Sequence, residues 1–261
     1  MPLNFHDRNN RSMYTGRTAD LGWQQLIERE VNIKGVRAAD IGCGGGIYTE
    51  ALAKLGAASV VGIDFSSAML EGAAASVHRS EVTFQQGNAL ETGLADEAVD
   101  LILERALIHH LTESELKDCF HEANRILSKE GTLIVQDRTP EDCLLEGNKE
   151  HLRGYLFEQY PQLKEKETGR RHAAERVIQI LNQSGFREIE EFPLWEIRQH
   201  YDTFTAYRDD LQHRTGRSIL HELTDEELNR LTDYIQKQTG FQDNDPVVEK
   251  DRWTIWIAKK H

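Results

Sequence analysis

The chain has 261 residues, 39% of them hydrophobic and 29% charged, which is typical of a folded globular protein rather than a disordered one. Its 44 acidic and 31 basic side chains give a net charge of −13, which disfavours nucleic acid as a substrate or partner. Its three cysteines match neither a disulfide framework nor a zinc site, and no apolar run reaches membrane-spanning length, so we expect a cytoplasmic protein without a metal or membrane partner.

From Val36 onward, short apolar runs alternate with amphipathic segments, a pattern that predicts a parallel sheet covered by helices on both faces. In chain order the predicted strands are 36–41, 59–63, 82–85, 99–103, 132–136, 186–192 and 253–258. Helical spacing of apolar residues marks predicted helices around 51–55, 69–77, 112–127 and 174–181. We therefore expect an α/β fold with a doubly wound, mainly parallel sheet of seven strands.

Two segments, 141–171 and 201–247, do not fit this repeating unit and are too long to be simple connections. Both contain helix-like stretches, and Thr224 with Glu227 forms a capping box at the start of one of them. We interpret the two segments as helical insertions that form a cap. The core then consists of residues 1–140, 172–200 and 248–261.

The run from Asp40 to Gly46, DIGCGGG, lies where a predicted buried strand turns into a helix. Glycines there permit positive φ and let a ligand approach the backbone, while the start of the helix presents free N–H groups. A tight flexible turn would explain the glycines equally well. Asp64 favours a nucleotide site, because a carboxylate 22 residues after Gly42, at the end of the next strand, can accept hydrogen bonds from both ribose hydroxyls of an adenosine.

A nicotinamide-dependent oxidoreductase also joins a glycine loop to a distant acid. Its third glycine position is occupied here by Ile47, or by Thr49 if the count starts at Gly44. Asp40 directly before the loop would also repel a pyrophosphate, whereas it suits a ligand that carries an ammonium and a sulfonium. The loop therefore disfavours a dinucleotide.

Five segments resemble, in order, the motifs of class I S-adenosylmethionine-dependent methyltransferases: 39–46, 62–64, 87–89, 99–111 and 125–133. In the last of them, a proline and one glycine of the R-x-L-x-P-G-G-x-L pattern are replaced. The motifs are similar to those of the small-molecule group that includes the quinone-biosynthesis methyltransferases. The resemblance implies a Rossmann-like enzyme that uses S-adenosylmethionine and methylates a small molecule by in-line displacement.

The resemblance implies roles for residues of the glycine loop and the second strand. Gly42 and Gly44 would line the methionine moiety of the cofactor, and Asp40 would lie near its positive charges. Asp64 would hold the ribose. Cys43, Phe65 and Met69, which neighbour these positions, complete this part of the predicted cofactor site.

Asn88 and Ala89 would flank the adenine. Many members of the family have Asp at the position of Asn88, and an amide can also pair with the adenine edge. Glu104 ends the fourth strand at the carboxyl edge, where it either meets the cofactor or forms an ion pair with Arg105 or a cap arginine.

His109 and His110 follow within one turn, and either could accept a proton from the methyl acceptor. A histidine before a helix can equally well fix the loop backbone. Tyr14 and Arg17 either fold over the carboxylate of the cofactor or belong to a disordered arm.

Three functions remain open: a methyltransferase, a nicotinamide oxidoreductase of similar fold and a non-catalytic regulator that binds an adenosyl cofactor. The insertions favour the first, because they suggest an enclosed pocket for the acceptor. One stretch of the second insertion and its flank is rich in basic and aromatic residues, which suits an acidic or aromatic acceptor: Arg198, Arg208, Arg214 and Arg217, with Tyr201, Phe204 and Tyr207 between them. Pairing of these arginines with nearby carboxylates is the alternative.

Overall fold

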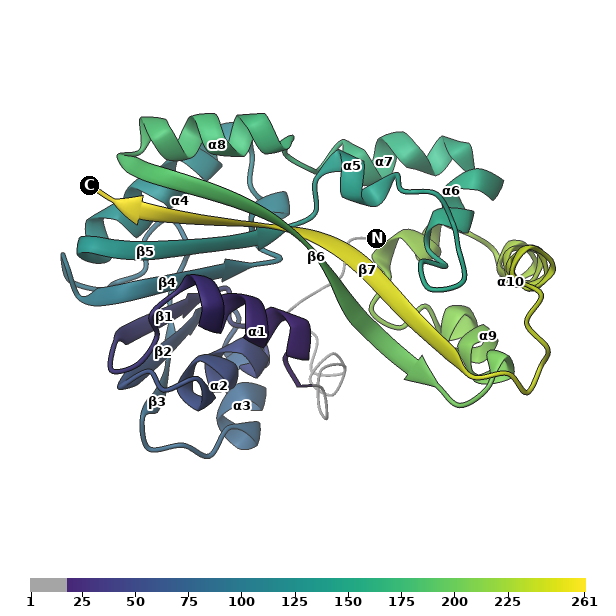
Figure 1. The fold of residues 1–261 in the computed structure, drawn as a ribbon, viewed down its shortest axis with the longest axis horizontal. Helices are drawn as coiled ribbons and strands as arrows, with labels where there is room; N and C mark the ends of the chain where they lie inside the picture. Colours follow the sequence, from purple (N-terminus) through teal and green to yellow (C-terminus); the bar gives the residue numbers. More distant parts are fainter. Residues whose placement is uncertain (1–17) are drawn as a thin grey trace. The chain divides into compact units, whose positions relative to one another are not determined.

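The computed structural model describes residues 18–261, which form two compact units (Figure 1). The sheet unit contains residues 18–138, His172–Leu194 and Thr254–His261. The helical unit contains Thr139–Arg171 and Trp195–Trp253. Tyr14 and Arg17, both predicted to bind the cofactor, lie outside the described residues.

The strands form one sheet of seven in the order β3-β2-β1-β4-β5-β7-β6 (Figure 1). Their bounds are Val82–Gln86 for β3, Ser59–Asp64 for β2, Arg37–Ile41 for β1, Val99–Arg105 for β4, Leu127–Asp137 for β5, Val247–Lys260 for β7 and Phe186–Tyr201 for β6. The first five strands of this order pair in parallel, and β7 is antiparallel to β5. The predicted seven-stranded, mainly parallel, Rossmann-like fold is confirmed.

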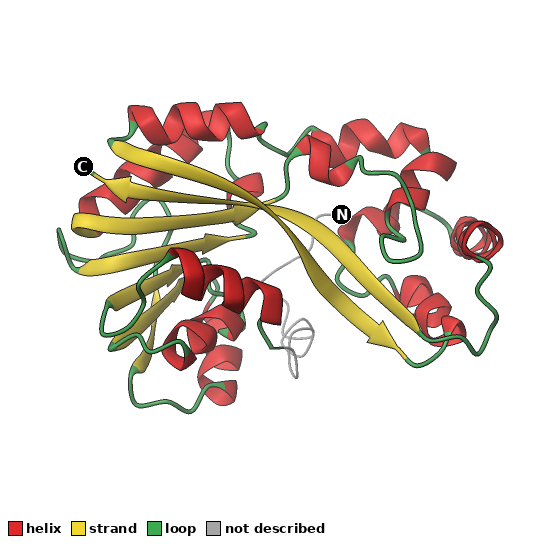
Figure 2. Ribbon diagram, viewed as in Figure 1, coloured by secondary structure: helices red, strands yellow, loops and turns green. Residues whose placement is uncertain are grey.

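Helices cover both faces of the sheet unit (Figure 2). One buried core joins the sheet to α4 (Glu113–Ile126) and α8 (Ala174–Gln183). A second core joins it to α1 (Leu21–Glu30) and α2 (Ile47–Lys54), and α3 (Ser67–Ser76) follows β2. Apolar residues on β4 alternate between the two cores, with Ile102 in the first and Leu103 in the second, which is the pattern of a strand buried on both sides.

Helix α1 and the full lengths of β6 and β7 were not predicted. Asp20 accepts a hydrogen bond from Trp23 N as the N-cap of α1, so a cap signal was present in the sequence. β6 was expected to end at residue 192 and β7 to begin at residue 253, but both strands extend into the helical unit. Because β6 is an edge strand with mostly exposed side chains, it lacks the apolar run by which buried strands are recognised.

The helical unit contains helices from two distant segments of the chain. These are α5 (Pro140–Cys143), α6 (Gly154–Gln159), α7 (Lys164–Thr168), α9 (Phe204–His213) and α10 (Asp225–Thr239). The capping box at Thr224 and Glu227 is present at the start of α10. Leu152 and Leu156 of the first segment share one core with Leu228 of the second, so the two segments form one body. Among residues 18–261, no helix combines the length and apolarity needed to cross a bilayer.

Candidate cofactor and catalytic site

The glycine loop connects the end of β1 to α2. Its three glycines Gly42, Gly44 and Gly46 have φ values of +75°, +51° and +79°, which residues other than glycine rarely adopt. The N–H groups of Gly42 and Cys43 both donate to Ile63 O, at 2.7 and 3.0 Å, and so fix the loop against β2. The loop is thus an ordered turn at the carboxyl edge of the sheet, where open α/β folds collect ligands.

Asp64 links this loop to the turn after β2. Its carboxylate accepts a hydrogen bond from Gly44 N at 3.0 Å and from Ser66 N at 2.8 Å. Burial raises the pKa of Asp64 above its ordinary value, although these backbone donors oppose the shift. Asp64 therefore positions the glycine loop, a structural role that the sequence did not suggest.

Asp40 is buried beneath the loop and accepts a hydrogen bond from Thr49 Oγ1 at 2.6 Å. Burial raises its pKa to about 6, against the opposing effects of the Thr49 hydroxyl and the Arg105 charge. The Arg105 guanidinium lies 4.1 Å from the centre of the Tyr48 ring, a cation–π contact. The carboxylate thus anchors the first turn of α2 and places negative charge under the loop.

Three further predicted residues lie around the loop. Cys43 is buried, and its sulfur would lie 3.0 Å from a Cβ added at Gly62, so the thiol packs against β2. The methyl carbon of Met69 lies 3.4 Å from the corresponding position on Gly44. Phe65, which directly follows Asp64, is 50% exposed.

Asn88 uses part of its hydrogen-bonding capacity within its own turn. Its Oδ1 accepts from Leu90 N at 3.0 Å, and its backbone pairs with Glu91. The side-chain amide group is the remaining polar group that could meet an adenine edge. Ala89 packs against the core shared by the sheet and α4.

Glu104 lies on the opposite face of β4 from Arg105, because successive side chains of a strand alternate. It is completely buried, and its Oε1 accepts from Cys119 Sγ of α4 at 3.4 Å. Among the described residues, its Oε2 has no hydrogen-bond partner, and burial raises its pKa to about 7. Within this described part of the chain, Glu104 forms an ion pair neither with Arg105 nor with a cap arginine.

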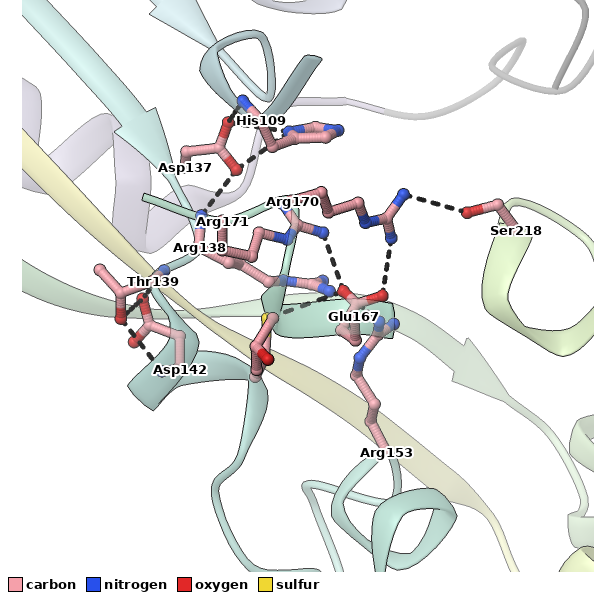
Figure 3. A network of polar contacts seen from close by, with 12 residues as sticks. His109, Asp137, Arg138, Thr139, Asp142, Arg153, Glu167, Arg170, Arg171 and Ser218 are labelled. Atoms are coloured by element: carbon pink, nitrogen blue, oxygen red, sulfur yellow. Dashed lines mark hydrogen bonds and ion pairs between the residues drawn. The ribbon is translucent and has the colours of Figure 1, made fainter. Parts of the chain in front are cut away.

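His109 forms a dyad with Asp137, the last residue of β5. His109 Nδ1 lies 2.9 Å from Asp137 Oδ2, and the backbone N–H of His109 donates to the same oxygen at 3.2 Å. Asp137 is buried, and its other oxygen accepts from Arg138 N at 2.8 Å (Figure 3). Because a carboxylate can only accept, the proton of a neutral His109 resides on Nδ1, and Nε2 carries a lone pair.

The turn that carries His109 is held by His172. His172 Nε2 lies 3.0 Å from both Ile108 O and Leu111 O, the carbonyls on either side of the two histidines. The ring of His110 lies 4.0 Å from that of His109, and His110 is exposed. The geometry therefore separates two residues that the sequence left equivalent.

Sequence reasoning missed Asp137 and His172. Asp137 directly follows the predicted strand 132–136, so the rule that singled out Asp64 could have found it. His172 precedes α8 and carries no comparable signal.

The arginines predicted to present themselves to an acceptor are all paired within the helical unit. Arg208 donates to Asp233 at 2.6 Å and Arg214 to Asp225 at 2.7 Å. Arg198 and Arg217 both contact Glu249, and Arg217 also contacts Asp210 at 2.6 Å. The alternative interpretation, in which nearby carboxylates neutralise these arginines, is therefore the observed one.

A family model described as a methyltransferase domain matches residues 39–135, all within the sheet unit. The ubiquinone biosynthesis O-methyltransferase of Azorhizobium caulinodans is 34% identical over 107 residues, which is 40% of this chain and 40% of that protein. Its counterpart from Pelagibacter ubique is 31% identical over 104 residues, or 40% of this chain and 42% of that protein. The similarity thus spans about two fifths of the length of these curated relatives.

Solved structures share the fold over most of the chain. A protein described as a methyltransferase from an antibiotic biosynthesis pathway of Anabaena variabilis is 21% identical, with a TM-score of 0.68 over 92% of this chain and 98% of that one. Phosphoethanolamine N-methyltransferase 2 of Haemonchus contortus is 20% identical, with a TM-score of 0.57 over 99% of this chain and 61% of that one. The match of residues 39–135 confirms the predicted resemblance to the class I S-adenosylmethionine-dependent methyltransferases, whose cofactor is S-adenosylmethionine, and disfavours the oxidoreductase alternative.

Proposed function

We propose that this protein transfers the methyl group of S-adenosylmethionine to a small molecule that loses a proton from oxygen or nitrogen in the reaction, and that His109 is the general base. The observation that carries this proposal is the bond from His109 Nδ1 to the buried carboxylate of Asp137. That bond leaves Nε2 as the acceptor and stabilises the imidazolium formed when the proton arrives.

Residues of the sheet unit fit the cofactor. The glycine loop packs closely against the Leu107 side chain, which would lie 3.2 Å from a Cβ on Gly42. Gly42 and Gly44 would contact the methionine moiety through their backbone, and Asp64 would accept from the ribose. Phe65 would stack against the adenine, with the Asn88 amide at its edge.

S-adenosylmethionine supplies a methyl group on a positively charged sulfur. The acceptor atom forms a bond to that methyl carbon while the carbon–sulfur bond breaks, giving the methylated product and S-adenosylhomocysteine. The proton of the acceptor goes to His109 Nε2 and later to solvent. The base contributes about 10²- to 10⁴-fold to the rate enhancement. Alignment of the methyl donor with the acceptor and exclusion of water contribute the rest.

The first test is binding. Titration calorimetry should show that S-adenosylhomocysteine binds to the full chain and that NAD does not. The second test is turnover: a metabolite extract incubated with methyl-labelled S-adenosylmethionine should yield a labelled small molecule, which then serves as the assay substrate. Cofactor binding without transfer to any extracted compound would favour the non-catalytic regulator.

His109→Gln and His110→Gln provide a matched pair on one turn. We expect the first to lower kcat and flatten its dependence on pH, and the second to leave both near normal. Loss of activity in both variants together, with the pH profile unchanged, would show that the turn matters only as structure.

A further inference from the structure

The turn that carries His109 is short. It is one 3-10 turn, in which His110 N donates to Leu107 O at 3.0 Å and Leu111 N donates to Ile108 O at 3.1 Å. A turn of this length has poor hydrogen-bond geometry and little stability of its own. Contacts with other elements of the sheet unit therefore decide where the His109 side chain points.

The chain enters this turn through a strained backbone conformation. β4 ends at Arg105, and the next residue, Ala106, has a φ of +53°, in the left-handed region that alanine rarely adopts. Ala106 N donates to Gln136 O at 2.8 Å, so β5 holds this residue in place. Such strain persists only where surrounding contacts determine the path of the chain, and it clusters at functional sites. The residues that follow Ala106 are the place to look for further contacts of this kind.

His172 contacts the backbone at both ends of the turn. Its Nε2 lies 3.0 Å from Ile108 O and 3.0 Å from Leu111 O. Because a carbonyl oxygen can only accept, Nε2 carries a proton and donates it to both oxygens. One neutral tautomer and the imidazolium both have this N–H group, so either form maintains the contact. A single side chain thus bridges the two carbonyls that flank His109 and His110.

His172 is itself placed by a packed helix. It precedes α8, which begins at Ala174 and packs through Val177 on the core that the sheet shares with α4. Arg176 of α8 forms an ion pair with Glu113 in the first turn of α4. All these residues belong to the sheet unit. The imidazole of His172 can therefore hold the turn at a fixed position relative to β4 and β5.

Asp137 and His172 restrain different parts of the same turn. Asp137 accepts from the ring of His109 at 2.9 Å and from its backbone N–H at 3.2 Å (Figure 3). These bonds set the tautomer and the rotation of the ring, whereas His172 fixes the carbonyls on either side of it. A general base has to lie within about 2.6–3.2 Å of the atom whose proton it takes. A shift of the turn by about 1 Å would therefore remove His109 Nε2 from its working position.

We propose that His172 is a positioning residue for methyl transfer: its Nε2–H group holds the turn so that His109 Nε2 faces the proton of the acceptor. His172 acts through His109 and not on the acceptor. This role rests on the proposed function, in which His109 is the general base.

The role is tested in the full chain with the labelled acceptor found in the extract assay. His172→Ala removes the donor and should lower kcat about 10- to 100-fold, the effect expected of a small misplacement of a catalytic group. The KM for S-adenosylmethionine and the affinity for S-adenosylhomocysteine should stay unchanged. His172→Gln keeps an N–H group close to the position of Nε2 and should restore most of kcat. His172→Phe, which keeps a ring without the N–H group, takes the place of the alanine variant if that variant does not fold.

A double variant shows whether His172 acts through His109. Because His109→Gln already lacks the base, the addition of His172→Ala should lower kcat no further.

Arg187→Ala is the matched control. Arg187 Nη1 also donates to two carbonyls, Asn182 O at 2.9 Å and Phe186 O at 2.7 Å, but it lies at the start of β6 beside the C-terminus of the chain (Figure 1). It should keep its kcat.

A measurement without turnover separates failure of this inference from failure of the proposed function. In the resting chain at mildly alkaline pH, ¹⁵N NMR of the histidine rings should show His109 protonated at Nδ1. In His172→Ala the His109 signals should shift, and those of the exposed His78 should not.

Three results would overturn the positioning role: an unchanged kcat in His172→Ala, His109 signals that do not respond to it, or a double variant in which the two losses multiply. Full activity of His109→Gln would instead count against the proposed base, and the NMR comparison would still decide whether His172 positions the turn.

Discussion

Replacement of Asp64 by alanine tests whether this carboxylate holds the cofactor as well as the loop. In the structure it accepts from Gly44 N at 3.0 Å and Ser66 N at 2.8 Å, and both N–H groups would lose their acceptor in Asp64→Ala. A lost bond of this kind costs about 1–3 kcal/mol of folding stability. If Asp64 also accepts from the ribose, the loss of a charged acceptor costs a further ~1.5–3 kcal/mol of binding free energy.

The expected outcome is an affinity for S-adenosylhomocysteine about 10- to 150-fold weaker than that of the original chain. Titration calorimetry measures the affinity, and urea denaturation without ligand measures the stability. Asp100→Ala is the matched control, because Asp100 accepts from Arg37 N at 3.0 Å and Ser128 Oγ at 2.9 Å near the start of β4, away from the carboxyl edge. This control should lose stability and keep its affinity.

Equal affinities of the two folded variants would refute the reasoning. Asp64 would then be a residue that only fixes the glycine loop.

Three further perturbations follow from the ionisable groups. Asp137→Asn should lower kcat by about 10²- to 10⁴-fold and hardly change cofactor affinity, because the amide would donate to His109 Nδ1 and leave the proton on Nε2; an unchanged pH–rate profile would contradict this. Burial raises the pKa of Glu104 to about 7 in the folded state, from 4.5 for an unperturbed glutamate, so its protonated form favours folding. The free energy of unfolding should therefore fall by up to ~3 kcal/mol as the pH rises between those values. Urea denaturation at pH 5 and pH 8 measures this loss, which Glu104→Gln should remove. Glu249→Gln should cost about 3–5 kcal/mol of stability, because it leaves the buried Arg217 with one carboxylate partner; a loss below ~1 kcal/mol would show that the network contributes little.

Most of the sheet unit was predictable because its signals are local. The buried strands β1, β2 and β4 are short apolar runs, and the glycines of the first turn mark where β1 gives way to α2. The edge strand β6 gave a weak signal, since solvent faces most of its side chains. The extension of β7 before residue 253 could not be inferred from an apolar run for a different reason, because its buried side chains include the charged Glu249 and Asp251.

Those residues of the candidate site that lie at the end of a single strand could be predicted from the sequence. Asp40, Gly44 and Asp64 were identified by their positions at or next to the carboxyl ends of β1 and β2, and the hydrogen bond from Gly44 N to Asp64 agrees with that placement. The separate contacts of Glu104 and Arg105 follow from strand alternation, a simple rule that disfavours their ion pair, one of the alternatives left open by the sequence.

The sequence by itself determined the fold class, the position of the glycine loop and the candidate acids at the ends of the strands, because turn chemistry and apolar periodicity act over a few neighbouring residues. Only the tertiary structure decided which groups meet. His109 and Asp137 are 28 positions apart and come together because β4 and β5 end at the same edge of the sheet. Arg153 contacts Glu167, 14 positions away, because the helices of the helical unit fold back on one another. No local sequence pattern predicts such an ion pair.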